Sequence, residues 1–306
     1  MLFNRFFHPE LDSRTRRRAL REMAFTNVLR TILARIVVAL AAGSSLAALA
    51  EPVGSTPDLV FSVTEGVTYQ ATPKEIRDKF EPLAEVIGKA MRRNVRVVLV
   101  PAYDDARAGL ARQEFDIAFI HPAHVAMAEI KAGRYRSIAW TSGYTDYAVS
   151  LLAKADEPIK DLGDLKGRKM VTPDPDSITA VMVRSMLRTG NVRTGDLKLL
   201  TTRYQDAVPF YLENGFATVG ATAASGVVKQ WTDKGGKVVL RSRGVPIKQV
   251  IASSRLTAEE RERIHDVLVN LAQSDAGRRA LAASGYKAFV ATDADLEERT
   301  IAWLGL

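Results

Sequence analysis

The sequence contains no cysteine. The chain therefore has no disulfide, no thiolate nucleophile, no thiolate metal site and no cysteine that could carry a lipid after export. Aromatic residues make up only 7% of the chain and form no stripe with basic residues, which argues against a nucleic-acid surface. The signatures G-x-S-x-G, H-E-x-x-H, G-x-x-x-x-G-K-[ST] and G-x-G-x-x-G are missing. Nothing here argues for an enzyme, and we expect no cofactor.

The positive charge is concentrated at the start of the chain. Residues 1–50 hold eight arginines against Glu10, Asp12 and Glu22, so that +5 of the formal net charge of +8 falls there. The +3 left for the other residues is too small to indicate binding to nucleic acid. With 306 residues, 47% of them hydrophobic, the chain suits one large or two medium domains.

Residues 1–50 have the pattern of an export signal. The short apolar run Ile36 to Ala42 follows Arg30 and Arg35, and small residues then lead to Ala48-Leu49-Ala50. A charged region, a short apolar region and an A-x-A site are typical of a secretory signal, so we expect cleavage after Ala50. A membrane anchor is the less favoured alternative, because the run is too short to span a bilayer comfortably. The mature protein is therefore expected to work outside the cytoplasm.

The start of this signal has two alternatives. The segment SRTRRRALRE lies upstream of Met23 and is unusual for a secretory signal, so Met23 is a possible true start. A twin-arginine signal is a weaker interpretation, because Arg16-Arg17 lies far from the apolar run. Both interpretations lead to export.

Two sets of alternating strands and helices follow. Apolar periodicity predicts the first set between Asp58 and Thr141, in an order typical of a parallel sheet covered by helices. Thr72-Pro73-Lys74-Glu75 is a capping box that opens a helix, and Pro82 is expected to kink or restart that helix. A longer strand is predicted from Tyr144 to Lys154, and the second alternating set follows up to Leu240.

The chain is predicted to cross between the two sets near residues 142–150 and again near residues 243–250. These crossings predict two lobes with a cleft, where the first lobe holds residues 51–143 plus 250–306 and the second holds residues 144–249. Ligands of open α/β sheets bind at the carboxyl ends of strands, so the loops after the strands are the candidate site.

One such loop precedes the helix that starts near Ser177. The start of a helix offers unpaired N–H groups and a positive dipole end, which favour an anion, and Ser177 and Thr179 add hydroxyls. Asp176 or Ser177 is the natural N-cap, and from this stretch alone we favour the simpler interpretation that the hydroxyls only cap the helix. Asp174 and Asp176 also count against an anion, unless they point away or accept a ligand proton.

Three stretches in order resemble one known family. They are EFDIAFIHPAHVAMA, EPIKDLGDLKGRKMVTPDPDSITAVM and VPIKQVIASSRLTAEERERI, which begin at Glu114, Glu157 and Val245. Over roughly Leu59 to Asn270 the chain resembles the phosphate/phosphite/phosphonate-binding proteins of ABC transporters. The resemblance implies an α/β fold with a two-lobed periplasmic-binding-protein-like (type II) architecture and a hinge between the lobes.

The resemblance also implies a ligand site. In such proteins a helix N-terminus with Ser/Thr hydroxyls, a Tyr and often a His hold the ligand's oxygens. Two weaker candidates lie in the second lobe, a Tyr that opens a helix and a Thr for which small-residue helix packing is the favoured alternative. The candidate ligand-binding residues are Tyr69, His121, Ser177, Ile178, Thr179, Tyr204 and Thr222.

Other roles stay open for several of these residues. Tyr69 equally suits packing on the helix behind it, and His121 suits a buried cap of the next helix. His121 and His124 have no third histidine near them in sequence, so we expect no metal site. Tyr144 and Tyr147 line the cleft or support the hinge, and the hinge is favoured.

The sequence departs from the family pattern at two places. Where the family has a Ser-Thr-Ser-Gly core, this chain has Ser177-Ile178-Thr179-Ala180, which changes the number of hydroxyls. Members that bind an aminoalkyl group carry an acid in the second lobe, where this chain has Asn214-Gly215-Phe216-Ala217-Thr218 without one. This departure argues against an aminophosphonate, so that a smaller oxyanion or a different small molecule is expected.

The first functional hypothesis is a periplasmic solute-binding protein that delivers a small oxyanion of the phosphonate, phosphite or phosphate class to a membrane ABC permease. We expect a monomer that binds no nucleic acid. The second hypothesis keeps the fold but makes the protein a sensing subunit that signals to a membrane receptor or histidine kinase. An exported enzyme is the third, for which no nucleophile–base set is found.

Overall fold

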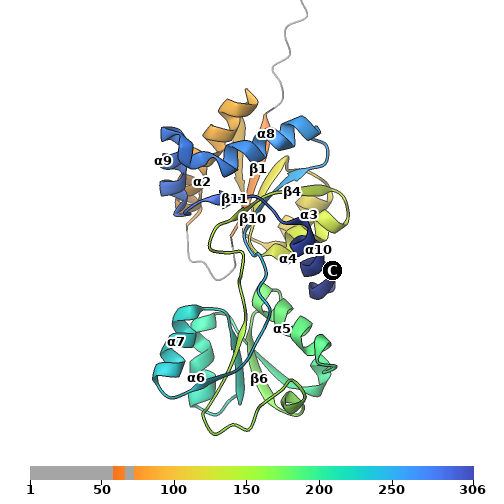
Figure 1. Ribbon diagram of the computed structural model, residues 1–306, viewed down its shortest axis with the longest axis vertical. Helices are drawn as coiled ribbons and strands as arrows, with labels where there is room; N and C mark the ends of the chain where they lie inside the picture. Colours follow the sequence, from red (N-terminus) through yellow and green to blue (C-terminus); the bar gives the residue numbers. More distant parts are fainter. Residues whose placement is uncertain (1–57, 66–71) are drawn as a thin grey trace, which may run out of the picture. The chain divides into compact units, whose positions relative to one another are not determined.

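The computed structural model describes residues 58–65 and 72–306 (Figure 1). The predicted export signal and Tyr69 lie outside the described residues. Within these residues, no helix combines the length and apolarity needed to cross a bilayer. The strands form two separate sheets, one of six strands and one of five.

The first sheet is mixed rather than parallel. Its strands are β1 (Leu59–Thr64), β2 (Val95–Leu99), β3 (Ile117–Ile120), β4 (Tyr135–Thr141), β10 (Gln249–Ser253) and β11 (Phe289–Val290). In the order β11-β4-β10-β3-β1-β2, the pairs β1–β2 and β1–β3 are parallel, but β10 runs antiparallel between β3 and β4. The expectation of a parallel sheet was thus correct for β1 to β3 only, because β10 enters from the opposite end of the sheet.

Helices cover both faces of this sheet. They are α2 (Pro73–Met91), α3 (Tyr103–Ala111), α4 (Ala123–Lys131), α8 (Ala258–Val269) and α9 (Asp275–Ser284). Apolar residues of α2, α8 and α9 pack with Phe61 and Phe119 in one core cluster, whereas Leu110 of α3 and Val125 of α4 pack in another. The strands between these two clusters are buried on both faces, which explains why they read as continuous apolar runs.

The capping box of α2 is confirmed. The Thr72 hydroxyl accepts a hydrogen bond from the Glu75 amide at 3.2 Å, and the Glu75 carboxylate accepts one from the Thr72 amide at 2.7 Å. The predicted restart of the helix at Pro82 was wrong, since α2 continues through this residue. Phe80 and Leu83 on either side of the proline are both buried in the core, and this packing holds the helix together despite one missing backbone bond.

The second sheet has the order β7-β6-β8-β5-β9. Its strands are β5 (Ser150–Ala153), β6 (Lys169–Pro173), β7 (Lys198–Thr202), β8 (Val219–Thr222) and β9 (Lys237–Arg241). β6 is parallel to β7 and β8, and β5 is antiparallel to β8 and β9. The long strand predicted from Tyr144 to Lys154 was wrong in length, because its first half leaves the sheet.

The second sheet is also covered on both faces. Its helices are α5 (Ile178–Thr189), α6 (Val208–Glu213) and α7 (Ser225–Asp233), and the last helix of the chain is α10 (Ala294–Leu304). Met182 of α5 and Leu304 of α10 share one core cluster, while Leu212 of α6 and Trp231 of α7 belong to another. The first of these clusters also contains Met127 of α4, so α10 and α4 pack together beside α5.

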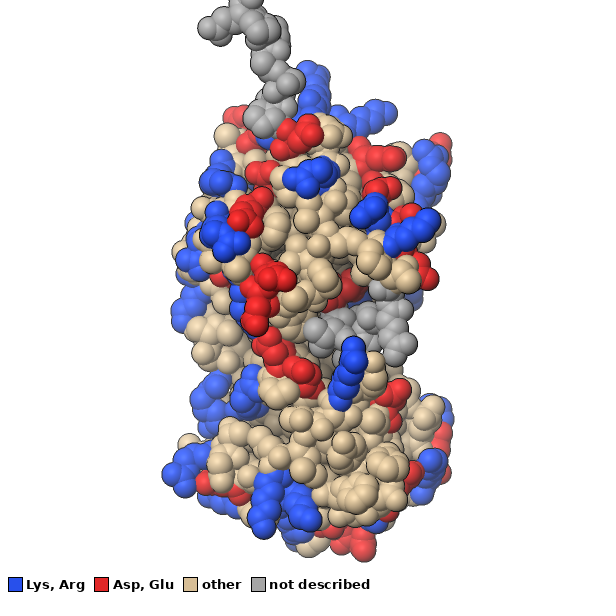
Figure 2. Space-filling model, turned by 180° about the vertical axis from the view of Figure 1, so that it is seen from behind, with Lys and Arg blue, Asp and Glu red and all other residues tan. Residues whose placement is uncertain are grey.

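Short 3-10 turns connect some of these elements. They are η1 (Gly163–Leu165), η2 (Thr194–Asp196), η3 (Gln205–Ala207) and η4 (Leu271–Gln273). On the face of the molecule in Figure 2, acidic and basic side chains are interspersed over both lobes.

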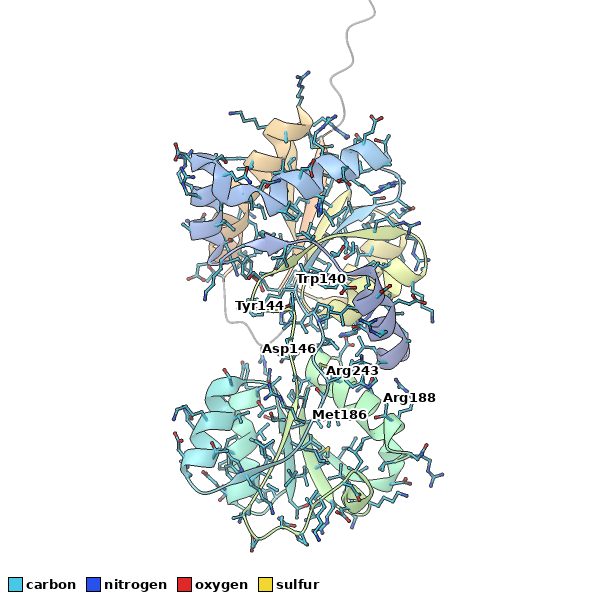
Figure 3. All side chains as sticks on the ribbon, viewed as in Figure 1. Trp140, Tyr144, Asp146, Met186, Arg188 and Arg243 are labelled. Carbon is cyan, nitrogen blue, oxygen red and sulfur yellow. The ribbon has the colours of Figure 1, made fainter. Side chains whose placement is uncertain are left out.

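Two chain segments join the sheets, residues 142–149 after β4 and residues 242–248 before β10. They run antiparallel, with the Tyr147 and Val245 amides each donating to the other residue's carbonyl at 3.0 Å. A Cβ on Gly244 would lie 1.6 Å from a carboxylate oxygen of Asp146, so any larger residue would force this side chain to move. Figure 3 shows Tyr144 and Asp146 on the first of these segments. We name the paired segments the hinge.

Candidate functional site

The ends of the strands place the candidate loops on both sides of the hinge. In the first sheet, Gln249 at the start of β10 pairs with Ile120 at the end of β3. In the second sheet, Ser150 at the start of β5 pairs with Thr222 at the end of β8. The hinge segments therefore enter each sheet at the carboxyl edge of its parallel strands, which is where ligands of such sheets bind.

The N-terminus of α5 lies on the carboxyl edge of the second sheet, directly after β6. Ser177 is its N-cap, and the Ser177 hydroxyl accepts a hydrogen bond from the Ala180 amide at 3.2 Å. The amides of Ile178 and Thr179 precede the first intrahelical bond and donate to no other group within residues 58–65 and 72–306. Two backbone donors and the positive end of the helix dipole are thus available to an anion.

The carboxylate of Asp176, which lies directly before Ser177, is neutralised by Arg107 of the first lobe. Arg107 of α3 donates to both carboxylate oxygens of Asp176, at 2.8 and 2.5 Å, and the His124 ring lies 3.5 Å from the same carboxylate. Burial raises the pKa of Asp176, but the hydrogen bonds and charge of Arg107 outweigh it and hold the pKa below its usual value. The other acid, Asp174, accepts a hydrogen bond from the Asp176 amide. Asp176 therefore does not oppose an anion as strongly as the sequence suggests.

A chain of neutral hydrogen-bonding groups extends from Thr179 across the carboxyl edge. The Thr179 hydroxyl lies 3.0 Å from the Tyr147 hydroxyl, which also accepts a bond from the Gln205 side-chain amide at 3.2 Å. The Gln205 side-chain oxygen accepts three bonds, from the Thr222 hydroxyl and from the backbone amides of Ala223 and Ala224. We name Tyr147, Thr179, Gln205 and Thr222 the hydroxyl network. It fixes the orientation of side chains from four separate segments.

His121 occupies the matching edge of the first sheet. Its amide donates to the Thr64 carbonyl at 2.9 Å, so it directly follows the ends of β3 and β1, and its side chain is buried. Burial lowers the pKa of His121 to about 3, helped by the positive charges of Lys248 and Lys79. Burial likewise lowers the pKa of His124 to about 4. Both rings are therefore neutral near pH 7.

The remaining predicted residues fall into different places. The Ile178 side chain is buried in the core of the second lobe, so only its backbone amide faces the helix start. The Tyr204 ring lies under the Arg203 guanidinium, with 5.3 Å between them, and it is the next residue, Gln205, that joins the hydroxyl network. Four of the seven predicted residues, Ser177, Ile178, Thr179 and Thr222, lie together at the carboxyl edge of the second sheet.

Sequence reasoning missed Gln205 and Arg107. Gln205 lies three residues after the end of β7, so its place in the loop after a strand was the available signal. Arg107 carried no such signal, because its contact with Asp176 joins positions far apart in the chain. Tyr147 was expected to support the hinge, and it both pairs with Val245 and bonds to Thr179.

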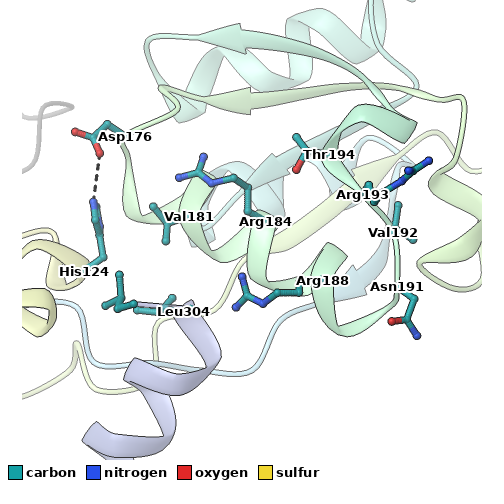
Figure 4. A pocket seen from close by; sticks show the side chains of 12 residues that line it. His124, Asp176, Val181, Arg184, Arg188, Asn191, Val192, Arg193, Thr194 and Leu304 are labelled. Atoms are coloured by element: carbon teal, nitrogen blue, oxygen red, sulfur yellow. Dashed lines mark ion pairs between the residues drawn. The ribbon is translucent and has the colours of Figure 1, made fainter. Parts of the chain in front are cut away.

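A pocket of about 790 Å³ lies along the flank of α5, next to α10 (Figure 4). It is lined by Val181, Arg184, Arg188 and Leu304, and Asp176 lies at one end of it. Ser177 and the hydroxyl network are not in its lining. We therefore treat it as separate from the site at the helix start.

At these edges, the part of the chain that the structure describes holds no group of three potential metal ligands. Within residues 58–65 and 72–306, one group of three potential ligands has donor atoms within 4.8 Å of each other, namely Glu262, His265 and Asp266. These residues lie on α8, and His265 Nδ1 is already 2.8 Å from the Ile138 carbonyl oxygen. This group of three is therefore separate from the hydroxyl network.

Comparison with solved structures concerns the fold. XAC2383 from Xanthomonas citri bound to ATP has a TM-score of 0.67 at 16% identity, with 82% of this chain and 98% of that chain covered. PhnD1 from Prochlorococcus marinus in complex with methylphosphonate has a TM-score of 0.58 at 12% identity, with 80% and 96% covered. The binding protein component PA3383 of an ABC phosphonate transporter from Pseudomonas aeruginosa has a TM-score of 0.53 at 17% identity, with 81% and 94% covered. The predicted α/β fold with two lobes is confirmed.

Comparison with protein families identifies the chain. No curated protein matches the sequence. The family described as "ABC transporter, phosphonate, periplasmic substrate-binding protein" matches residues 66–296, which is most of the chain. This match agrees with the three resembling stretches and with two sheets joined by a hinge. The chain belongs to the family of periplasmic substrate-binding proteins of phosphonate ABC transporters.

Proposed function

We propose that this protein, a phosphonate-binding periplasmic component of an ABC transporter, holds the phosphonate group of its ligand at the N-terminus of α5. The observation that carries this proposal is the pair of available amides, Ile178 and Thr179, beside the capping hydroxyl of Ser177. Three donors at one helix end and the aligned peptide dipoles favour an oxyanion over a neutral group. The chain serves transport and is not an enzyme, as its family implies.

The hydroxyl network supports this arrangement with neutral groups. Thr179 is held by Tyr147, which is held in turn by Gln205, so that its hydroxyl is oriented before the ligand arrives. Because Arg107 neutralises Asp176, the ligand's charge meets the helix end without a strong opposing charge. The ligand is thus bound by preorganised dipoles and hydroxyls in the second lobe rather than by a salt bridge there.

Closure of the lobes completes the binding step. The paired hinge segments allow the two sheets to move as units, and the ion pair between Arg107 and Asp176 joins one lobe to the other. The closed protein then presents its ligand to the membrane permease. We further propose that the export signal is cleaved after Ala50, that the lobe boundaries follow the predicted crossings, and that the protein acts as a monomer.

The ligand class follows from the second lobe. The Asn214 to Thr218 stretch carries no acid, so the ammonium group of an aminoalkylphosphonate has no partner there. A phosphonate without an amine, such as the methylphosphonate found with PhnD1 of Prochlorococcus marinus, suits this site better. No feature of the described residues favours the sensing alternative.

The test is a ligand panel followed by thermal unfolding. Purified protein is melted with methylphosphonate, phosphite, phosphate, sulfate or acetate at equal concentration and pH. A phosphonate at 100 times its dissociation constant should add about 2.7 kcal/mol to the free energy of unfolding, and sulfate and acetate should add much less. If no phosphorus oxyanion raises the melting temperature, the proposed function fails.

A further inference from the structure

The pocket along the flank of α5 has no role in the proposed function. Its volume of about 790 Å³ lies within the range of small-molecule sites, which is roughly 300–1,000 Å³. One wall is the side of α5 that carries Val181, Arg184 and Arg188, and another is the end of α10 with Leu304 (Figure 4). His124 of α4 lies at one end. We name this cavity the flank pocket.

The inner surface of the flank pocket is apolar. Val181, Val192 and Leu304 line it, and all three are buried. They belong to the same core cluster as Met182, so their side chains are held in place by packing. A molecule that covers them gains from placing hydrocarbon or a ring on this side.

Two arginines stand over this apolar surface, one helical turn apart on α5. Arg184 donates to the Pro175 carbonyl at 2.8 Å, and Arg188 donates to the Trp303 carbonyl. The charge of Asp176 acts on Arg184 from a longer distance, but neither arginine forms an ion pair within residues 58–65 and 72–306. Figure 4 shows both guanidinium groups extending from α5 over the pocket. Because a guanidinium has five N–H donors, each keeps donors for another partner.

The acidic and carbonyl oxygens beside these arginines already have cations of their own. The Asp176 carboxylate accepts two hydrogen bonds from Arg107, and the Leu306 oxygen accepts one from Lys131. A third arginine of the lining, Arg193, is paired with an acid at 2.9 Å. Among the described residues that line the pocket, the two arginines of α5 are therefore the cations without a carboxylate partner.

A buried ring nitrogen is a second, independent sign of a ligand. His124 is only 6% exposed, and its Nδ1 bonds to nothing in the described part of the chain. The other ring nitrogen, Nε2, lies 3.4 Å from the Arg107 guanidinium and 3.5 Å from the Asp176 carboxylate. Buried polar atoms without a partner are typical of sites that a ligand or water completes.

We propose that the flank pocket binds a small organic molecule that carries two acid groups. Each guanidinium of α5 binds one of these groups, a carboxylate or a phosphate, because its planar fork fits either one with two hydrogen bonds. Helix positions four residues apart have Cβ atoms about 5–6 Å apart, which sets the spacing of the acid groups. The apolar surface takes the hydrocarbon or ring between them. This site does not depend on the function proposed for the helix start.

The experiment compares three carboxylates that separate these requirements. Isophthalate has two carboxylates on a ring, benzoate has one carboxylate on a ring, and glutarate has two carboxylates without a ring. In calorimetric titrations of the purified protein at pH 7.5, isophthalate should bind about tenfold more tightly than benzoate, because it engages both arginines. It should bind roughly fivefold more tightly than glutarate, because its ring covers the apolar surface. Equal affinities, or no binding of isophthalate, would overturn the proposal.

Variants assign the preference to the two arginines. Arg184→Gln and Arg188→Gln should each bring the affinity ratio of isophthalate to benzoate close to one, because one acid group loses its partner. Both side chains are exposed, so their replacement leaves the core intact. Arg279→Gln is the matched control, since Arg279 is an exposed arginine on α9, and it should leave the ratio unchanged. An equal fall in the control would mean that only the overall charge matters, which rules out a specific site.

NMR spectra of ¹⁵N-labelled protein locate the bound isophthalate. The amides of Val192 and Leu304 should shift, while those of Ile178 and Thr179 should stay in place. Shifts confined to Ile178 and Thr179 would put isophthalate at the helix start and overturn a separate pocket. If methylphosphonate fails to bind while isophthalate shifts the pocket amides, the result supports the flank pocket and counts against the proposed function alone.

Discussion

The carboxyl edges of the two sheets carry different kinds of side chains. On the second lobe, the start of α5 and the hydroxyl network present amides and hydroxyls, all of them neutral. The first lobe instead carries ionisable side chains, namely the ion-paired Glu65, Lys79 and Lys248 and the buried, neutral rings of His121 and His124. Amides and hydroxyls do not titrate near neutral pH, whereas buried histidines with lowered pKa values make the stability of their lobe depend on pH. The comparison separates a neutral edge, which the proposed function uses, from an ionisable edge, which makes the stability of the protein depend on pH.

The largest expected effect is the pH dependence of the first lobe. His121 and His124 have pKa values of about 3 and about 4 in the folded protein and an ordinary value of 6.5 when unfolded. Because the folded pKa values are lowered, the unfolded state takes up protons first, and stability is lost as the pH falls below 6.5. At pH 5 each histidine should cost about 2 kcal/mol of stability, about 4 kcal/mol for the pair.

Urea unfolding at pH 7.5 and pH 5.0 measures this loss. The variant carrying both His121→Gln and His124→Gln is the comparison, since it lacks the two rings but keeps every carboxylate. Its stability should fall much less between the two pH values. Equal losses in both proteins would show that these rings are not the pH-sensitive groups.

The next effect concerns the helix start in the second lobe. Ser177→Ala should weaken phosphonate binding by roughly 1–3 kcal/mol, because the loss of the hydroxyl leaves a buried partner unpaired. Ser274→Ala is the matched control, since Ser274 caps α9 in the same way, accepting a bond from the Gly277 amide at 3.0 Å. Calorimetry should show reduced affinity in the first variant only, although both helices lose a cap worth about 1 kcal/mol of stability. Equal affinities would mean that Ser177 only caps its helix.

A third variant introduces charge into the hydroxyl network. Gln205→Glu keeps the oxygen that accepts bonds from Thr222, Ala223 and Ala224, but it removes the donor to Tyr147 and adds a negative charge. Phosphonate affinity should fall by about 1–2 kcal/mol, while the melting temperature changes little. Gln273→Glu, in the exposed turn η4, is the control for the added charge. An unchanged affinity in Gln205→Glu would place the ligand away from the network.

The smallest effect is expected at the hinge. Gly244→Ala brings a Cβ against the Asp146 carboxylate, which is exposed and can rotate away, so the cost should be about 1 kcal/mol or less. Gly226→Ala, where a Cβ meets nothing within 4 Å, is the comparison. Ligand-induced closure, measured by small-angle scattering with and without methylphosphonate, should be reduced only in Gly244→Ala. Full closure in Gly244→Ala would show that the close contact between residues 244 and 146 is not needed for the hinge to move.

The start of α5 in the second lobe could be predicted from neighbouring residues alone. The N-cap at Ser177 depends on neighbouring residues, so the helix start could be placed from sequence. The capping box at Thr72 was predicted for the same reason. Where local preference and packing disagree, packing decided, as the unbroken α2 through Pro82 demonstrates.

The contacts among charged side chains in the first lobe could not be predicted in this way. Glu65, Lys248 and Tyr286 meet only because β10 inserts between β3 and β4 and because the chain returns after the second lobe. Similarly, Arg107 and Asp176 are 69 positions apart and meet only when the lobes are in contact. The crossing near residues 243–250 was predicted, but the antiparallel insertion of β10 depends on the complete chain path.

The most direct test of the central claim is an NMR titration of ¹⁵N-labelled protein with methylphosphonate. A hydrogen bond to a phosphonate oxygen moves an amide proton downfield, so the largest downfield shifts should fall on the amides of Ile178 and Thr179. Largest shifts at Val192 and Arg193, which line the pocket on the flank of α5, with the helix start unchanged, would contradict the account.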